Sequence, residues 1–236
     1  MIDNEVVLKT AKDSGIKYKK RISELQKALA VTARHLKTSN RSLIVVFEGL
    51  DASGKSGCIR RLTRSLDTKQ YRVIPISKPT EEEYRYHYLK RFWDRLPPYG
   101  NIAFFDRSWY GRVLVERVEE LSSTNAWTRA WREINDFERL LTDDGSIIIK
   151  LWFDVSDGEQ LKRFKARMTD PEKAHKITEE DWRNRSKREE YLAARDDMLR
   201  YTDTEYAPWI VIPSDDKKEA RCRAAEEIIS RADLFV

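Results

Sequence analysis

The sequence predicts an α/β fold in which helices cover both faces of a parallel β-sheet. Short apolar strand candidates alternate with helix-like segments along most of the chain, which is the pattern of βαβ units. The strongest strand candidate, Ser42 to Phe47, is a continuous apolar run typical of a strand buried on both faces, and a glycine-rich loop and a helical pattern follow it. Since parallel sheets bind ligands beyond the carboxyl ends of their strands, chemistry is expected just after Phe47, Ser77, Phe105 and Phe153.

The remaining elements are expected in the following order. Apolar residues recur at near-helical spacing from Ile16 to Leu36, which predicts an amphipathic helix that packs against the core. The further strand candidates are residues 71–76, 101–105, 147–153 and 209–212. We therefore expect an N-terminal helical extension over residues 1–41, followed by a sheet-containing domain over residues 42–236.

Between Leu161 and Tyr201 the alternation stops, and a charge-dense helical stretch intervenes that is broken at Thr169-Asp-Pro171. We interpret residues 162–202 as an inserted helical lid. From Lys162 to Arg188 there are ten Lys or Arg and five Asp or Glu, so this segment alone carries a surplus of +5, equal to the formal charge of the whole chain. Such a surplus favours an anionic partner.

The composition is that of a globular protein without a membrane span. The chain has 236 residues, of which 40% are hydrophobic and 36% charged. Its apolar runs fall far short of the roughly 18 residues needed to cross a bilayer, and its polar N-terminus lacks the pattern of a signal peptide. The separated Cys58 and Cys222 suggest neither a disulfide framework nor a zinc site. We expect a cytoplasmic protein with reduced thiols, and a homo-oligomer.

The segment Gly49-Leu-Asp-Ala-Ser-Gly-Lys-Ser56 matches the phosphate-binding pattern G-x-x-x-x-G-K-S between a strand and a helix. Its backbone N–H groups would point at phosphate oxygens, Lys55 would supply a cation, and the Ser56 hydroxyl could reach Mg²⁺. The loop residues expected to contact phosphate are Gly49, Ala52, Ser53, Gly54 and Ser56. Asp51 leaves two alternatives, because its carboxylate could hold Mg²⁺ or cap the following helix.

A second cluster follows the strand candidate 101–105. Asp106 occupies the place of a Walker B acid and could bind Mg²⁺ directly or through water. Arg107 and Arg112 come next and concentrate cations at the carboxyl end of the sheet, where phosphoryl transfer would need them. Arg117 has glutamates nearby, so a phosphate contact and a surface salt bridge are equally open for it.

A third segment, Lys78-Pro-Thr80, follows the strand candidate 71–76 and precedes three glutamates. Pro79 would end the strand, and Thr80 would cap the acidic first turn of a helix. Because the segment lies at the carboxyl end of the sheet, Lys78 and Thr80 are also candidates for nucleotide contacts. Both interpretations are open.

These segments together resemble one family, polyphosphate kinase 2. The motifs that carry the resemblance are Glu48-Gly-Leu-Asp-Ala-Ser-Gly-Lys-Ser56, Lys78-Pro-Thr80, Phe105-Asp-Arg-Ser-Trp-Tyr-Gly-Arg112, Thr178-Glu-Glu-Asp-Trp-Arg-Asn-Arg185 and Thr204-Glu-Tyr-Ala-Pro-Trp209. They occur in family order from about Ser42 to near the C-terminus, which makes the resemblance specific. It implies a P-loop kinase fold, a helical lid, and Mg²⁺-dependent phosphoryl transfer between inorganic polyphosphate and a nucleotide.

By matching position, the resemblance also implies roles for single residues. Asp51 and Asp106 would hold Mg²⁺. Lys55 and Arg107 would contact the transferring phosphates, and Arg112 would stabilise them.

In the lid, Arg183 and Arg185 of the matched motif would supply further cations. The stretch Asp106 to Glu119 is similar to the AMP-phosphorylating branch of the family. This sequence differs from many members of that branch by carrying one P-loop unit instead of two fused units.

We expect an enzyme that moves phosphoryl groups from polyphosphate to AMP, or the reverse. The alternatives are a polyphosphate-dependent kinase that converts ADP to ATP, and an ATP-dependent nucleoside monophosphate kinase of the thymidylate kinase type, which needs a less extended cationic track. A nucleic-acid-binding P-loop protein is a third alternative, but Asp51 and Asp106 would repel a bare phosphate backbone. The expected partners are polyphosphate and adenine nucleotides, with neither nucleic acid nor a membrane.

Overall fold

The computed structural model describes residues 18–171 and 177–235, so Ile16, where the first helix is predicted to begin, lies outside them. Its centre is a five-stranded parallel sheet in the order β2-β3-β1-β4-β5. The strands are β1 (Ser42–Gly49), β2 (Tyr71–Pro75), β3 (Ile102–Asp106), β4 (Ser146–Asp154) and β5 (Trp209–Pro213). Each begins and ends within two residues of its predicted position.

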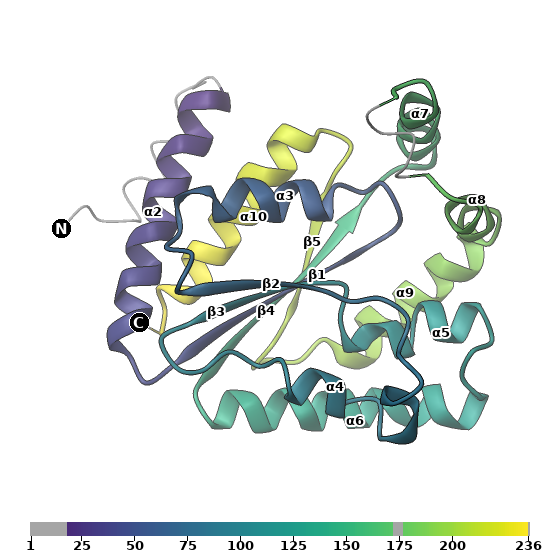
Figure 1. Ribbon diagram of the computed structural model, residues 1–236, viewed down its shortest axis with the longest axis horizontal. Helices are drawn as coiled ribbons and strands as arrows, with labels where there is room; N and C mark the ends of the chain where they lie inside the picture. The colour runs from purple at the N-terminus through teal and green to yellow at the C-terminus, as the bar shows by residue number, and fades with distance from the viewer. Residues whose placement is uncertain (1–17, 172–176, 236) are drawn as a thin grey trace.

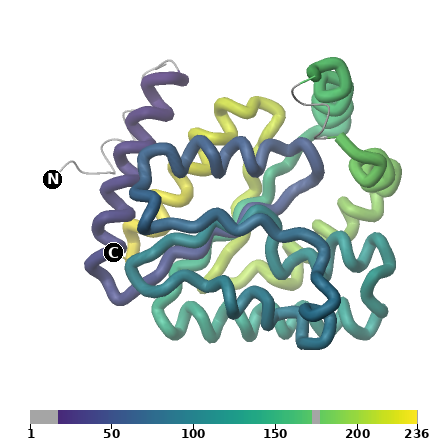
Figure 2. The backbone as a smooth tube through the Cα atoms, in the orientation of Figure 1, coloured from purple at the N-terminus to yellow at the C-terminus, as the bar shows by residue number. Residues whose placement is uncertain are grey.

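Helices cover both faces of the sheet (Figures 1 and 2), which confirms the predicted α/β class with three layers. One face carries α2 (Tyr18–Thr38), α3 (Lys55–Leu62) and α10 (Lys217–Ala232). The other carries α4 (Lys90–Trp93), α6 (Thr124–Asp143) and α9 (Arg188–Thr202). Short connecting elements are η1 (Thr63–Ser65), η2 (Glu83–Arg85), η3 (Trp109–Arg112) and α5 (Val115–Val118). Beyond the carboxyl ends of the strands lie α7 (Asp157–Met168) and α8 (Glu179–Ser186).

Each face of the sheet has its own apolar core, and β1 supplies both. Leu43, Val45 and Phe47 enter the core beneath α2, α3 and α10, whereas Ile44 and Val46 enter the opposite one. Because both faces of this strand are buried, its sequence shows no polar alternation. The apolar side of α2 packs into the same core as the sheet.

A fully buried charged pair holds the turn η3 in place. Lys150 Nζ of β4 donates to Glu138 Oε2 at 2.8 Å, to the Tyr110 hydroxyl at 2.9 Å and to the Thr202 carbonyl at 2.7 Å. Glu138 Oε1 accepts hydrogen bonds from Tyr110 OH at 2.7 Å and from Trp109 Nε1 at 3.0 Å. Because these groups satisfy one another, the start of η3 is fixed between the sheet and α6.

The segment 162–202, predicted as a lid, contains parts in different surroundings. In α7 Arg163 is buried, and in α9 Met198 is buried in the apolar core, whereas α8 has no buried residue. Lys173 and Lys176, which belong to the predicted basic surplus, lie outside the described residues.

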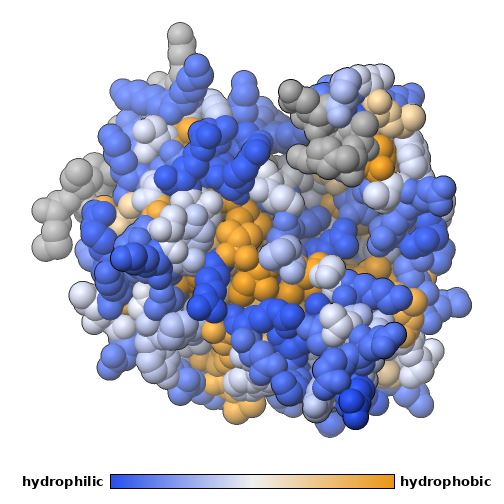
Figure 3. Space-filling view, in the orientation of Figure 1, coloured by the Kyte–Doolittle hydropathy of each residue, from blue (hydrophilic) through white to orange (hydrophobic). Residues whose placement is uncertain are grey.

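The surface seen in Figure 3 is mostly hydrophilic. An apolar patch lies near its centre, where the edge strand β2 runs in Figure 1, and Val73 of this strand is 43% exposed. Among the residues that the structure describes, no helix has both the length and the apolarity that a membrane span requires.

Candidate active site

The loop between β1 and α3, called here the β1–α3 loop (residues 49–55), curls tightly at the carboxyl end of the sheet. Gly49 has a φ of 142° and Gly54 a φ of 112°, values that L side chains rarely adopt. A Cβ on Gly49 would lie 2.5 Å from the carbonyl oxygen of Phe153 in β4. Glycine is therefore required there by the close approach of the two strands.

The Lys55 side chain folds back onto this loop. Its Nζ donates to the carbonyls of Gly49 and Leu50 at 2.6 and 3.1 Å, and to Ser53 Oγ at 3.4 Å. Burial lowers the pKa of the Lys55 ammonium group, and the nearby Arg107 acts in the same direction. A phosphate in the loop could replace these neutral carbonyl acceptors of the Lys55 ammonium group with anionic oxygens.

Asp51 does not cap α3, so that alternative for its carboxylate is wrong. The N-cap residue is Gly54, without a side-chain cap. Asp51 Oδ1 accepts a hydrogen bond from Arg107 Nη2 at 2.7 Å, and Oδ2 accepts one from Asn184 Nδ2 of α8 at 2.8 Å. Burial alone would raise the pKa of Asp51, but the cations of Arg107 and Lys55 outweigh burial and hold this pKa below its ordinary value.

Asp51 makes the stability of the fold sensitive to acid. Its folded-state pKa lies below the value of about 3.9 expected in the unfolded chain. Its stabilisation is therefore complete above that value and is lost as the pH falls through the folded pKa. We expect the urea midpoint of the wild type to fall on the acid side of about pH 5, and that of Asp51→Asn to fall less steeply. Equal acid slopes would contradict this prediction.

A cavity of about 510 Å³, called here the loop cavity, lies over the β1–α3 loop. Its walls bring together Asp51, Lys55, Ser56, Asp106 and Arg107, which the sequence places in two separate motifs. Further side chains come from three helices, namely Lys217 and Arg221 of α10, Arg167 of α7 and Asp181 of α8. Lysine and arginine therefore outnumber carboxylates around this space.

Within the loop cavity, Asp51, Asp106 and Ser56 are the residues that could hold Mg²⁺. In the described part of the chain, no three or more His, Cys, Asp or Glu side chains group as a metal site. Mg²⁺ does not require such a group, because it usually binds one or two carboxylates and completes its shell with water and substrate phosphates. The residues present fit a Mg²⁺ ion that is bound together with phosphate.

A second cavity, called here the outer cavity, has a volume of about 500 Å³ and is lined by Lys78, Tyr88, Arg91 and Arg112. This volume lies in the range of ligand pockets. Arg107 lines both the loop cavity and the outer cavity. Its φ of 66° is in the left-handed region, where a non-glycine residue is uncommon and often marks a functional constraint. Arg107 thus stands between two spaces that can accept anions.

Arg112 is held at the wall of the outer cavity by three side chains. Its Nε lies 3.2 Å from Glu116 Oε2, its Nη1 donates to Ser122 Oγ at 3.0 Å, and its guanidinium lies 4.5 Å above the Tyr88 ring. Burial raises the pKa of the Glu116 carboxyl. This arrangement fixes the orientation of the Arg112 guanidinium at the cavity wall.

Lys78 and Thr80 differ in their surroundings. Lys78 is exposed and lines the outer cavity. The Thr80 N–H donates to Glu83 Oε2 at 3.0 Å, and the Glu83 N–H donates to Thr80 Oγ1 at 3.2 Å. The helix predicted after Thr80 is only the single turn η2. The capping interpretation therefore accounts for Thr80, while Lys78 is placed where a nucleotide contact is possible.

Arg117 takes the salt-bridge alternative. Its Nη1 lies 2.7 Å from Asp197 Oδ2 of α9, and its guanidinium stacks 4.4 Å from the centre of the Trp127 ring. These contacts tie α5 to α6 and α9. The phosphate contact that the sequence left open for Arg117 has no support in this arrangement.

The two lid arginines also form ion pairs. Arg185 lies 2.8 Å from Asp157 Oδ2 and is 14% exposed, so it ties α8 to the start of α7. Arg183 lies 2.8 Å from Glu119 Oε2 but is 53% exposed and lines the outer cavity. Of the pair, Arg183 is the one placed to meet a ligand there.

Sequence reasoning missed the residue that holds the β1–α3 loop from outside. Arg163 Nη1 donates to the carbonyls of Ala52 and Ser53 at 2.9 and 3.1 Å, and Nη2 donates to those of Ser214 and Asp215 at 2.6 and 2.8 Å. In the sequence it is one basic residue among many in the predicted lid, and no local signal distinguishes it. We call Arg163 a positioning residue, since it binds the backbone of the loop and of residues 214–215 and pairs with Glu159 of its own helix.

Three further residues near the cavities were also missed. Arg91 lines the outer cavity, and Lys217 and Arg221 line the loop cavity. The spacing of Lys217 and Arg221, one helical turn apart on the last helix, is the only local signal that could have indicated them.

Comparisons with known proteins agree on one family. The family model for polyphosphate kinase 2 matches residues 12–234. A polyphosphate:AMP phosphotransferase of Pseudomonas aeruginosa is 47% identical over 211 residues, which cover 89% of this chain and 42% of that protein. A GDP-polyphosphate phosphotransferase of Mycobacterium tuberculosis is 40% identical, covering 85% of this chain and 67% of that one. A crystal structure of polyphosphate kinase 2 from Arthrobacter aurescens superimposes with a TM-score of 0.88 at 29% identity, covering 94% and 81% of the two chains.

Proposed function

This chain belongs to the polyphosphate kinase 2 family, and from this we propose that it transfers phosphoryl groups between inorganic polyphosphate and AMP with Mg²⁺ as cofactor. One observation carries the proposal: Arg107 lines the loop cavity and the outer cavity at once. A donor phosphate chain in the first and an acceptor phosphate in the second could therefore meet at one guanidinium.

The choice of AMP rests on the relatives. The relative named for AMP is 47% identical, whereas the one named for GDP is 40% identical. The chain spans 42% of the length of the former, so the activity of that whole protein supports the proposal by similarity only. No relative reported above is named as an ATP-dependent kinase, which leaves the thymidylate kinase alternative without support.

In the proposed reaction, an oxygen of the AMP phosphate attacks the terminal phosphorus of polyphosphate. The bond between that phosphorus and the bridging oxygen breaks, and the donor leaves one phosphate shorter. Lys55 and the loop amides hold the donor, Arg112 orients the acceptor, and Arg107 exchanges the Asp51 carboxylate for the phosphoryl group in transfer. Mg²⁺ bound through Asp51 and Asp106 would neutralise phosphate oxygens.

We expect ADP to form from AMP and polyphosphate at least about 10²-fold faster than ATP forms from ADP and polyphosphate. A pocket fitted to AMP places its phosphate for in-line attack, and one additional phosphate displaces the attacking oxygen by more than the roughly 1 Å that already costs this factor. Chromatography of the products over time measures both rates. A third reaction replaces polyphosphate with ATP as the phosphoryl donor and keeps AMP as the acceptor.

Two outcomes would overturn parts of the proposal. ATP formation from ADP at an equal rate would replace AMP by a nucleoside diphosphate as the acceptor. Turnover with ATP but not with polyphosphate would favour the nucleoside monophosphate kinase of the thymidylate kinase type.

We also propose that the protein is cytoplasmic. Cys58 and Cys222 are free and buried, as thiols of a reducing compartment can be. Burial raises the pKa of the Cys58 thiol to about 12, which makes it a poor nucleophile. The homo-oligomer stays a prediction.

A further inference from the structure

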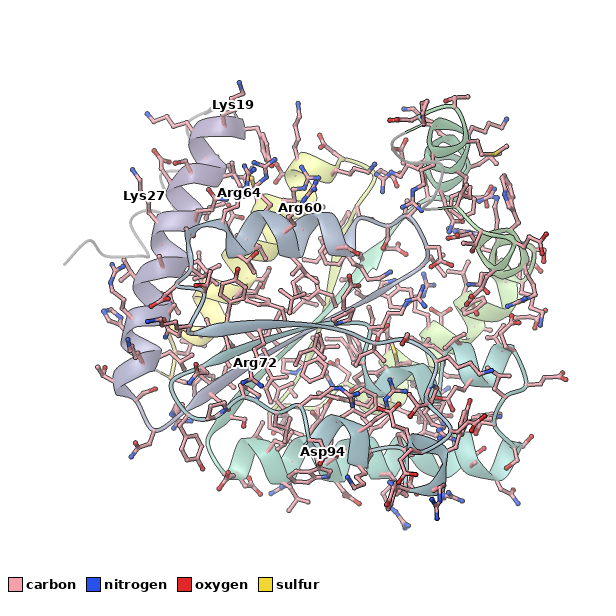
Figure 4. All side chains as sticks on the ribbon, in the orientation of Figure 1. Lys19, Lys27, Arg60, Arg64, Arg72 and Asp94 are labelled. Atoms are coloured by element: carbon pink, nitrogen blue, oxygen red, sulfur yellow. The ribbon has the colours of Figure 1, made fainter. Side chains whose placement is uncertain are left out.

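The helical layer formed by α2, α3 with η1, and α10 carries far more positive charge than the rest of the chain. These segments contain fifteen Lys or Arg and four Asp or Glu, although the formal charge of the whole chain is only +5. Figure 3 shows hydrophilic side chains over α2 and α3, and Figure 4 shows Arg60 on α3, Arg64 on the following turn η1, and Lys19 and Lys27 on α2. The charge of the protein is therefore strongly one-sided.

Three of the four carboxylates in this layer, Glu219, Glu226 and Glu227, form ion pairs with arginines of the same layer. Glu219 and Glu226 both bind Arg21, at 2.6 and 2.8 Å. In the described residues, neither Arg60 nor Arg64 forms an ion pair. The positive charge on the outer side of α3 is thus not cancelled locally.

This charge is continuous with the loop cavity. Arg221 lines the cavity, and its Nη2 would lie 3.4 Å from a Cβ placed on Gly57 in the first turn of α3. Arg221 Nη1 also donates to the hydroxyl of Tyr18, where α2 begins, at 3.4 Å. Arg221 therefore connects the rim of the cavity to both neighbouring helices.

From Gly57 the positive charge extends along one side of α3. Arg60 lies one turn after Gly57 on α3, and Arg64 follows in the turn η1, so the three positions span about 10 Å along this helical segment. The turn η1 contacts α2 here, because Ser65 Oγ donates to the carbonyl of Gln26 at 2.7 Å. We name Arg221 of α10, Arg60 of α3 and Arg64 of η1 the basic strip.

We propose that the basic strip binds the part of an inorganic polyphosphate chain that extends beyond the loop cavity. This inference rests on the proposed function. Each exposed cation attracts phosphate only weakly, but a long polyanion contacts several of them at once, so their contributions to affinity add up. AMP and ATP are too short to reach these cations from the loop cavity. The strip would make the enzyme prefer long donors over short ones.

Charge reversal at Arg60 of α3 and Arg64 of η1 tests the proposal without touching the loop cavity. For Arg60→Glu/Arg64→Glu we expect KM for long-chain polyphosphate to rise about tenfold at low salt, with kcat unchanged. KM for the shortest polyphosphate that the wild type turns over should stay within about twofold. The matched control is Arg132→Glu/Arg200→Glu on α6 and α9, which should leave both KM values unchanged. An equal rise for long and short donors, or no rise, would overturn the proposal.

Binding measured by fluorescence anisotropy keeps the test independent of turnover. Labelled long-chain polyphosphate should bind the Arg60→Glu/Arg64→Glu variant about tenfold more weakly than the wild type. If the variant and the wild type bind polyphosphate equally, the proposal that the basic strip binds this polymer is overturned, even if neither protein transfers phosphate. If single-stranded DNA binds the wild type as tightly and is lost in the same variant, the strip is a nucleic-acid site instead. If no polyphosphate chain length supports transfer, the proposed function is overturned. The anisotropy result then decides by itself whether the basic strip binds polyphosphate.

Discussion

Replacing Lys55 with alanine is expected to lower kcat by about 10²–10³-fold while the fold persists. Lys55 is 7% exposed, and its ammonium group lies among the carbonyls of the β1–α3 loop, where phosphate oxygens of the donor would bind. Its removal takes away a cation that acts most strongly in the transition state. Steady-state kinetics with AMP and polyphosphate measure the loss, and circular dichroism confirms the fold.

Lys69→Ala is the matched control, because Lys69 is an exposed lysine outside both cavities. It should retain wild-type kinetics. A folded Lys55→Ala protein with nearly wild-type kcat would contradict the proposal that the β1–α3 loop binds the transferring phosphate.

Asp106→Asn and Asp51→Asn are each expected to lower kcat by about 10²-fold or more, because an amide is a poor ligand for a hard cation such as Mg²⁺. Their effects on stability should differ. Asp51 binds Arg107 and Asn184, so Asp51→Asn leaves a guanidinium without its carboxylate and should lower Tm. Within residues 18–171 and 177–235 Asp106 forms no ion pair, so Asp106→Asn should nearly retain the wild-type Tm.

A magnesium titration of activity separates the metal role from other roles of these carboxylates. Both variants should need more Mg²⁺ for half-maximal rate, and excess Mg²⁺ should not restore the full rate. If Asp51→Asn needs no more Mg²⁺ than the wild type, its carboxylate acts only by positioning Arg107.

The sheet and the β1–α3 loop could be predicted from the sequence because their signals are local. The apolar run of β1 reflects burial on both of its faces, and Gly49 meets a backbone constraint at its own position. In β4 the prediction succeeded although Lys150 interrupts the apolar pattern, since its charge is satisfied by Glu138 inside the core. The helix expected after Thr80 failed, because Thr80 and Glu83 complete a single capped turn.

The parts of the site that could not be predicted depend on partners distant in the sequence. Arg117 pairs with Asp197, 80 residues away, and Arg163 binds carbonyls of the β1–α3 loop 110 and 111 residues away. A guanidinium that binds phosphate and one that binds a carbonyl or carboxylate look the same in sequence. Which of the two it does is decided by the fold, and for this reason the roles of Arg112 and Arg183 stay predictions.

The strand order has a consequence for how the protein folds. β1 pairs with β3 and β4 but not with the next strand along the chain, and Ser42 meets Ser146 across 104 residues. No hairpin can nucleate such a sheet, and the entropy of closing these long loops must be offset before the pairing stabilises the chain, which slows folding. Because a Cβ on Gly49 would meet the Phe153 carbonyl, the β1–α3 loop reaches its final packing only when β4 lies beside β1. A nascent chain shorter than about 153 residues would thus leave the β4 edge of the apolar strand β1 unpaired, although β3 could already lie on its other edge.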